Sequence, residues 1–232
     1  MKKEVEKAID ELRKGNFILV YDADGREEET DFFIPAEFVK AESIYRMRKD
    51  GGGLIFIMLE YNIAKKLGLP YLSEIIYNCS DNWPLFREII PNDIPYDTKS
   101  SFSLTINHRK TFTGIRDIDR AMTISKFAEI VKEAEKLESK EAMNIFGKNF
   151  RSPGHVPICI SAKNLLKERN GHTELGIALA EMAGLTPVMA GCEMLDFGES
   201  LSKKKAREYA LMNGLVFVEG YEIVEAWEEW QG

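Results

Sequence analysis

The sequence crowds six carboxylates and one guanidinium into residues 22–31, directly after the apolar run 17–21. A short, β-branched apolar run of this kind indicates a buried strand. The ends of such strands are where open α/β sheets usually bind their ligands. Because like charges at this spacing repel one another, the loop needs a counter-charge, either Arg26 or a divalent cation. The alternative is a solvated acidic turn, which is the usual role of such a charge run taken alone.

A second polar group lies directly before a helix that the pattern predicts over residues 174–183; its members are Arg169, Asn170, Gly171, His172, Thr173 and Glu174. A helix N-terminus attracts phosphate through its unpaired N–H groups and the positive end of its dipole. Arg169 adds a planar fork for phosphate oxygens, and Gly171 permits close approach of the backbone. His172 is a candidate metal ligand, with Glu174 supporting it or moving protons. The alternative is that Thr173 caps the helix and His172 is a polar surface residue.

Three further groups are weaker signals. His155 ends the sequence Arg-Ser-Pro-Gly-His before a predicted strand, and it is a catalytic candidate or a structural loop histidine. The loop 109–114 offers cationic and hydroxyl groups to an anion. Glu193 follows an apolar strand, where burial would raise its pKa into a range useful for proton transfer. The alternative for Glu193 is a solvent-facing strand end.

Helices and strands alternate along the whole chain, which predicts a single layered α/β (α+β) domain over residues 1–232 with a mixed, twisted sheet flanked by helices. Predicted strands cover residues 17–21, 31–34, 54–59, 102–106, 156–160, 186–192 and 215–218. The first predicted helix begins near residue 5. Further helices are predicted at 43–49, after a cap at Thr123, at 174–183 and at 202–213, and a last helix runs to Trp230. Residues 70–97 show little periodicity, so we expect an irregular excursion of the kind that often serves as a lid or binding segment.

Composition restricts the class of protein. The chain has 232 residues, a net charge of −7 and 44% hydrophobic residues, typical of a globular protein and unlike a basic nucleic-acid binder. It contains no apolar run of the roughly 18–20 residues that would span a membrane, and the N-terminus lacks the apolar core of a signal peptide. The three cysteines show no metal-type spacing, and their odd number argues against a disulfide framework. We therefore expect a cytoplasmic protein that binds neither nucleic acid nor membrane.

Taken in order, the motifs resemble those of one family. They read Arg-Glu-x-Glu-x-Asp at 26–31, Gly-Gly-Leu-Ile at 52–55, Thr-x-Thr-Gly at 111–114, Arg-x-Pro-Gly-His-Val at 151–156, Gly-His-Thr-Glu at 171–174 and Cys-Glu-Met at 192–194. The chain is similar to the 3,4-dihydroxy-2-butanone 4-phosphate synthases of riboflavin biosynthesis over roughly residues 4–225. Members of that family convert D-ribulose 5-phosphate to 3,4-dihydroxy-2-butanone 4-phosphate and formate. They use Mg²⁺ or Mn²⁺ and act as homodimers with active sites at the subunit interface.

The resemblance implies a role for individual residues. Glu27 and His172 fall on the metal-ligand positions. Catalysis is assigned to His155 and Glu193, together with Asp31. The substrate-binding positions fall on Arg26, Glu27, Asp31, Arg169, Asn170, Gly171, His172, Thr173 and Glu193. Of the other acidic residues in the loop, Glu29 is expected to support the metal site, while Asp22, Asp24 and Glu28 are expected to have ordinary surface or loop roles.

The chemistry of these residue types agrees with the implied reaction. A ketose phosphate needs a metal that polarises its carbonyl, acids and bases that move protons, and an anion cradle. One imidazole beside one carboxylate leaves the choice between Mg²⁺ and Mn²⁺ open.

The sequence also departs from the family pattern. Phe56 stands where relatives usually carry Cys, Ile160 stands where they often carry Arg, and Ala23, Gly25 and Thr30 alter the acidic loop. Two alternatives therefore stay open. One is a related sugar-phosphate lyase or isomerase with another substrate. The other is a non-catalytic binding module of the same architecture, which also resembles YrdC-type nucleotide- and RNA-binding proteins.

Overall fold

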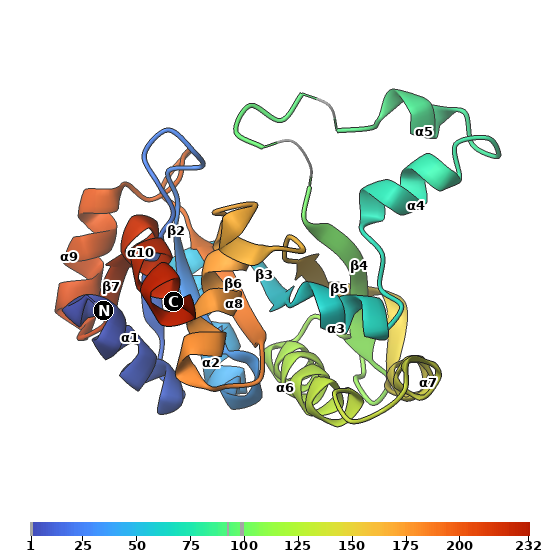
Figure 1. Ribbon diagram of the computed structural model, residues 1–232, viewed down its shortest axis with the longest axis horizontal. Helices are drawn as coiled ribbons and strands as arrows, with labels where there is room; N and C mark the ends of the chain where they lie inside the picture. The colour runs from blue at the N-terminus through green and yellow to red at the C-terminus, as the bar shows by residue number, and fades with distance from the viewer. Residues whose placement is uncertain (1, 92, 98–99) are drawn as a thin grey trace.

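The protein is described by a computed structural model that covers residues 2–91, 93–97 and 100–232. In this part of the chain seven strands form one mixed sheet in the order β4-β5-β3-β6-β2-β1-β7 (Figure 1). The strands are β1 Ile18–Tyr21, β2 Thr30–Pro35, β3 Gly52–Leu59, β4 Phe102–His108, β5 Phe150–Ile160, β6 Val188–Met194 and β7 Val216–Glu219. Pairs β1–β7 and β3–β5 are parallel, and the other neighbouring pairs are antiparallel. The predicted mixed sheet flanked by helices is confirmed.

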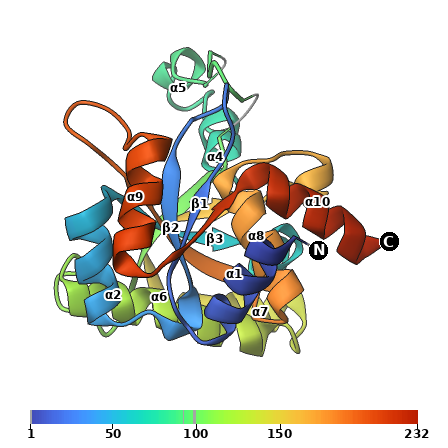
Figure 2. The ribbon, with the colours of Figure 1, turned by 90° about the vertical axis from the view of Figure 1, so that its left-hand side faces the viewer.

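Helices cover both faces of the sheet. They are α1 Lys3–Arg13, α2 Ala41–Arg46, α3 Tyr61–Lys66, α4 Leu72–Asn78, α5 Leu85–Glu88, α6 Asp117–Ala134, α7 Ser139–Asn149, α8 His172–Ala183, α9 Lys203–Asn213 and α10 Gly220–Gln231. Helices α1, α8 and α10 lie on one face, and α2 and α9 lie on the other (Figure 2). In the described part of the chain, no helix combines the length and the apolar character that crossing a membrane requires.

Two hydrophobic cores explain why the strand sequences are continuously apolar. Side chains alternate between the two faces of a strand, and both faces are covered here. On β3, for example, Ile55 and Ile57 enter the core beneath α2 and α6, whereas Phe56 and Met58 enter the core beneath α8. A strand buried on both faces shows no apolar–polar alternation. For this reason the continuous apolar runs 17–21 and 54–59 predict buried strands.

Several expected boundaries are wrong. Helix α6 begins at Asp117 and not at Thr123, whose hydroxyl instead donates to the Asp119 carbonyl and accepts from the His108 amide. The sequence before the Val156 strand is not a loop, because β5 begins at Phe150. Helices α3 and α7 were not predicted. The excursion 70–97, of which residue 92 lies outside the described residues, contains helices α4 and α5, neither of which has a buried side chain.

Asp119 fastens the loop before α6. Its side chain is 3% exposed and accepts hydrogen bonds from the Gly114 amide at 3.0 Å, the Thr113 hydroxyl at 3.2 Å and Arg116 Nε at 2.9 Å. The bond from Arg116, and after it that from the Gly114 amide, lowers the pKa of Asp119 although burial opposes the shift. The loop that carries Thr-x-Thr-Gly is therefore held by one carboxylate.

We predict that Asp119→Ala lowers the free energy of unfolding by about 2 kcal/mol, because it leaves the buried Gly114 amide without an acceptor and removes the partner of Arg116. Glu133→Ala, an exposed change on the same helix, is the control and should change stability by less than about 0.5 kcal/mol. A carboxyl group with a lowered pKa stabilises the fold at neutral pH and loses that contribution as the pH falls through its folded pKa. Urea titrations should therefore show a gap between wild type and Asp119→Ala that is constant near pH 7 and shrinks below about pH 4. A gap that is absent at pH 7, or that grows with acid, would contradict this role.

Candidate active site

The acidic loop connects β1 to β2 and is organised from within by Asp22. This carboxylate is 2% exposed and accepts hydrogen bonds from the backbone amides of Glu27 and Glu29, each at 3.0 Å. It also accepts from Arg26 Nη1 at 3.1 Å. Of the two expected roles of Asp22, the surface role is wrong because the side chain is buried, and the role within the loop is the one observed. Asp22 shapes the loop, and the side chains of Glu27 and Glu29 remain available to the cavity.

The start of α8 meets this loop. His172 is the first residue of α8, is 6% exposed, and follows Gly171 at the N-cap position; Thr173 is not the cap. His172 Nδ1 lies 3.3 Å from Glu27 Oε2, and His172 Nε2 lies 3.6 Å from Asp31 Oδ1. Donor atoms of Asp22, Glu27 and His172 all lie within 4.8 Å of one another. Two segments separated by more than a hundred residues thus converge on one point.

Burial and charge determine the protonation of this group. Burial raises the pKa of Glu27, but the hydrogen bond and charge of His172 and the charge of Arg26 outweigh it, so the pKa falls to about 2. Burial lowers the pKa of His172, yet the charges of Asp31 and Glu27 raise it to about 9. The pKa of Asp31 is raised well above its usual value, mainly by burial. Without a ligand, the imidazolium of His172 is the counter-charge that the crowded carboxylates require.

Glu193 enters from β6, opposite Asp31 of β2 in the antiparallel register. Its position depends on Gly53, because a Cβ at Gly53 would lie 2.4 Å from Glu193 Oε2 and 2.7 Å from Glu193 Cβ. Only a residue without a side chain leaves this space. Burial raises the pKa of Glu193 above its ordinary value. Two carboxyl groups with raised pKa values, Asp31 and Glu193, thus lie side by side on neighbouring strands.

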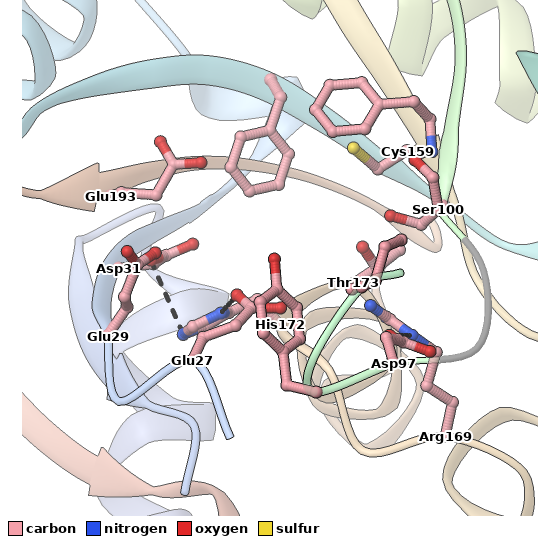
Figure 3. Close-up of a pocket in the computed structure, with 15 residues that line it drawn as sticks. Glu27, Glu29, Asp31, Asp97, Ser100, Cys159, Arg169, His172, Thr173 and Glu193 are labelled. Carbon is pink, nitrogen blue, oxygen red and sulfur yellow. Dashed lines mark hydrogen bonds and ion pairs between the residues drawn. The ribbon is translucent and has the colours of Figure 1, made fainter. Parts of the chain in front are cut away.

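These side chains open into a cavity of about 190 Å³. Figure 3 shows Glu27, Glu29, Asp31 and Glu193 at one end, and Asp97, Ser100 and Arg169 at the other. The remaining lining residues are Phe56, Ile94, Tyr96, Ser101, Phe102, Cys159, His172 and Thr173. The cavity therefore has an acidic end beside His172 and an end that contains the guanidinium of Arg169.

The structure brings together most of the predicted site residues. Those that line the cavity are Glu27, Asp31, Arg169, His172, Thr173 and Glu193. Arg26 is ion-paired to Glu27 at 2.7 Å. Asn170 and Gly171 do not line the cavity, although Gly171 lies against Arg169 and Arg26. Ile160 is buried in the core.

His155 is the predicted site residue that lies apart. It does not line the cavity in this chain; it is exposed on β5, with Nδ1 3.0 Å from Asn107 Nδ2. The structure does not bring His155 to the other predicted site residues, so its role in catalysis stays a prediction.

Sequence reasoning missed Tyr96, Asp97 and Cys159 as lining residues. The available signal for the first two was the excursion 70–97, predicted as a possible binding segment, whose last residues reach the cavity. Cys159 had no signal of its own, because the pairing of β3 with β5 determines where it points.

The donor set fits a divalent cation. Within the described residues, four buried groups here have atoms without a hydrogen-bond partner: both carboxylate oxygens of Asp31, Nε2 of His172, Oε2 of Glu193 and Oγ1 of Thr30. Unsatisfied buried polar atoms are costly unless something binds them. Carboxylate oxygens with one imidazole nitrogen are ligands for Mg²⁺ and Mn²⁺.

Fold and site together define an α/β protein with a small pocket that is acidic at one end and contains the guanidinium of Arg169 at the other. The model of the family described as 3,4-dihydroxy-2-butanone 4-phosphate synthase matches residues 6–226. The chain belongs to this family of riboflavin biosynthesis enzymes.

Two archaeal relatives of the same name are similar over nearly their whole length. The protein of Methanothermobacter thermautotrophicus is 46% identical over 229 residues, which cover 98% of this chain and 97% of the relative. That of Archaeoglobus fulgidus is 45% identical over 229 residues, covering 97% and 94%. A solved 3,4-dihydroxy-2-butanone 4-phosphate synthase in complex with two magnesium ions has the same fold, with a TM-score of 0.78, 24% identity and 98% of each chain covered.

Proposed function

We propose that the protein is a metal-dependent carbon–carbon lyase that converts D-ribulose 5-phosphate to 3,4-dihydroxy-2-butanone 4-phosphate and formate in the cytoplasm. The observation that carries the proposal is the convergence of Glu27, His172, Asp31 and Glu193 in one cavity with Arg169, where His172, Asp31 and Glu193 have buried atoms without a hydrogen-bond partner. The names of the archaeal relatives support the same reaction.

Glu27 and His172 would hold the metal, Mg²⁺ or Mn²⁺. The ion would supply Lewis acidity to the carbonyl and hydroxyl oxygens of the sugar. The similar structure in complex with two magnesium ions supports this choice of cation. When the metal binds, His172 gives up its proton, because an imidazole nitrogen binds a metal only in its neutral form.

The other cavity residues would bind the substrate and move its protons. Arg169, Arg26 and the amides of residues 170–173 would bind the phosphate, with the hydroxyl of Thr173 beside them. Asp31 and Glu193, whose pKa values are raised by burial, would take protons from carbon and return them to oxygen. The skeletal rearrangement and the loss of formate both require such transfers.

The site would be completed in a homodimer. His155 is exposed and away from the cavity, and its contact Asn107 also lies against Gly114. Around Gly114 the chain exposes large apolar side chains: Phe112 is 82% exposed, Ile118 57% and Ile115 50%. Exposed apolar side chains gathered in this way are typical of protein interfaces. We propose that this face contacts a second copy, so that the partner's His155 reaches the cavity.

An altered substrate is the second candidate, and Phe56 favours it. Phe56 lines the cavity at the position where the family pattern has cysteine, and Cys159 of the neighbouring strand lines the same cavity. A ring in so small a pocket restricts the length of the sugar. A panel of pentose and tetrose phosphates would separate the candidates, since the main proposal requires ribulose 5-phosphate to be the best substrate.

Formate release is the direct test of the reaction. Purified protein with Mg²⁺ or Mn²⁺ should release one formate for each ribulose 5-phosphate consumed, and EDTA should abolish turnover until the metal is restored. We expect turnover to require the metal because the side chains that line the cavity do not supply its Lewis acidity. Absence of formate with either metal would exclude the proposed reaction and favour a binding module.

Mixing two inactive variants tests the interface site. Glu193→Gln and His155→Ala should each be inactive, because the two residues would serve the same site from different subunits. Subunit exchange between the two variants should recover about a quarter of wild-type turnover, since half of the dimers are mixed and each of these has one intact site. Native mass spectrometry of differently tagged copies would verify that mixed dimers form. Mixed dimers without recovered activity would show that His155 does not act across the interface.

A further inference from the structure

Asp97 joins the two arginines that the proposed function assigns to the phosphate end of the substrate. Its Oδ2 atom accepts from Arg169 Nε at 2.5 Å and from Arg26 Nη2 at 3.2 Å. The side chain of Asp97 is only 9% exposed and lines the cavity. One carboxylate oxygen therefore connects the acidic loop to the segment before α8.

Each arginine is also held from its other side. Arg169 Nη1 donates to Glu174 Oε2 at 2.5 Å, and Glu174 is itself fixed by the Ala162 amide, which donates to its Oε1 at 2.7 Å. Arg26 Nη1 donates to Asp22 and Glu27. Two fixed nitrogens determine the plane and rotation of a guanidinium. In the described part of the chain Arg169 Nη2 has no protein acceptor, so this nitrogen is left for a ligand.

The contacts of Asp97 differ from those of the preceding helices. Helices α4 and α5 contribute no buried side chain and project from the body of the protein (Figure 1). Tyr96, next to Asp97, places its ring 5.7 Å from the Arg26 guanidinium and lines the cavity too. The pair Tyr96–Asp97 thus contacts the site directly, whereas α4 and α5 bury no side chain of their own.

We propose that Asp97 is a positioning residue for substrate binding: it holds Arg26 and Arg169 in the arrangement that receives the phosphate group. The inference rests on the proposed function. Ordering two long side chains at the moment of binding costs rotamer entropy, and Asp97 removes that cost by ordering them beforehand. Its negative charge acts in the opposite direction, since a phosphate near it is repelled. Positioning prevails in this proposal because the Asp97 oxygen is bonded to both guanidinium groups.

The test compares Asp97→Asn with Asp93→Asn in the metal-loaded protein. Both variants remove one negative charge from the same segment, but Asp93 is exposed and does not line the cavity. Calorimetry with inorganic phosphate as the probe should show a dissociation constant about tenfold higher for Asp97→Asn, because two charge-assisted hydrogen bonds are weakened. Asp93→Asn should match wild type. In turnover, KM for ribulose 5-phosphate should rise by a similar factor while kcat changes far less, because the lost contacts act on binding.

Unchanged or tighter phosphate binding by Asp97→Asn would overturn the inference, and tighter binding would show that Asp97 competes with the phosphate. If Asp97→Asn does not fold, Asp97→Glu takes its place; it keeps the charge but displaces the oxygen, and should weaken phosphate binding for the same reason. Formate release by wild type separates the two claims. If wild type releases formate and the Asp97 variants bind phosphate normally, the proposed function stands and only the role of Asp97 fails.

Discussion

The arrangement of the site depends on the pairing of Glu27 with His172. The acidic loop places several carboxylates in a partly buried volume, and such a cluster is unstable without positive charge. His172 supplies that charge from the start of α8, 3.3 Å from Glu27, and Arg26 and Arg169 supply the rest. When His172 is neutral, a bound divalent cation would supply this positive charge instead. The loop between β1 and β2 is therefore only half of a site.

The sheet brings these halves together. Strands β2 and β6 are neighbours, so Asp31 and Glu193 lie opposite each other, while α8 packs across the same face and directs His172 toward them. Small residues keep this approach open. Gly53 leaves room for Glu193, and Gly176 of α8 leaves room for Met58, whose sulfur would lie 2.4 Å from an added Cβ. Packing between strands and α8 thus determines the distances on which the chemistry depends.

The sequence predicted the mixed sheet and six of the cavity residues because both depend on local signals: apolar runs buried on two faces, and polar motifs at strand and helix ends. Other features depend on contacts that a sequence does not display. Asp22 resembled the exposed acids around it, but it folds back onto the amides of Glu27 and Glu29. Asp97 lies in a stretch without periodicity and acquires its role from two arginines distant in the chain. His155 lies on β5 and does not line the cavity. Its catalytic role therefore stays a prediction, and it rests on the proposed homodimer.

Manganese affinity tests the central claim, that the acidic loop and the start of α8 hold one cation together. Electron paramagnetic resonance measures free Mn²⁺ directly in a titration of the protein. We expect Glu27→Gln and His172→Gln each to weaken binding by at least about tenfold, because each removes one ligand. Glu28→Gln removes an exposed acid from the same loop and should leave the affinity unchanged. Wild-type affinity in both Glu27→Gln and His172→Gln would contradict the account.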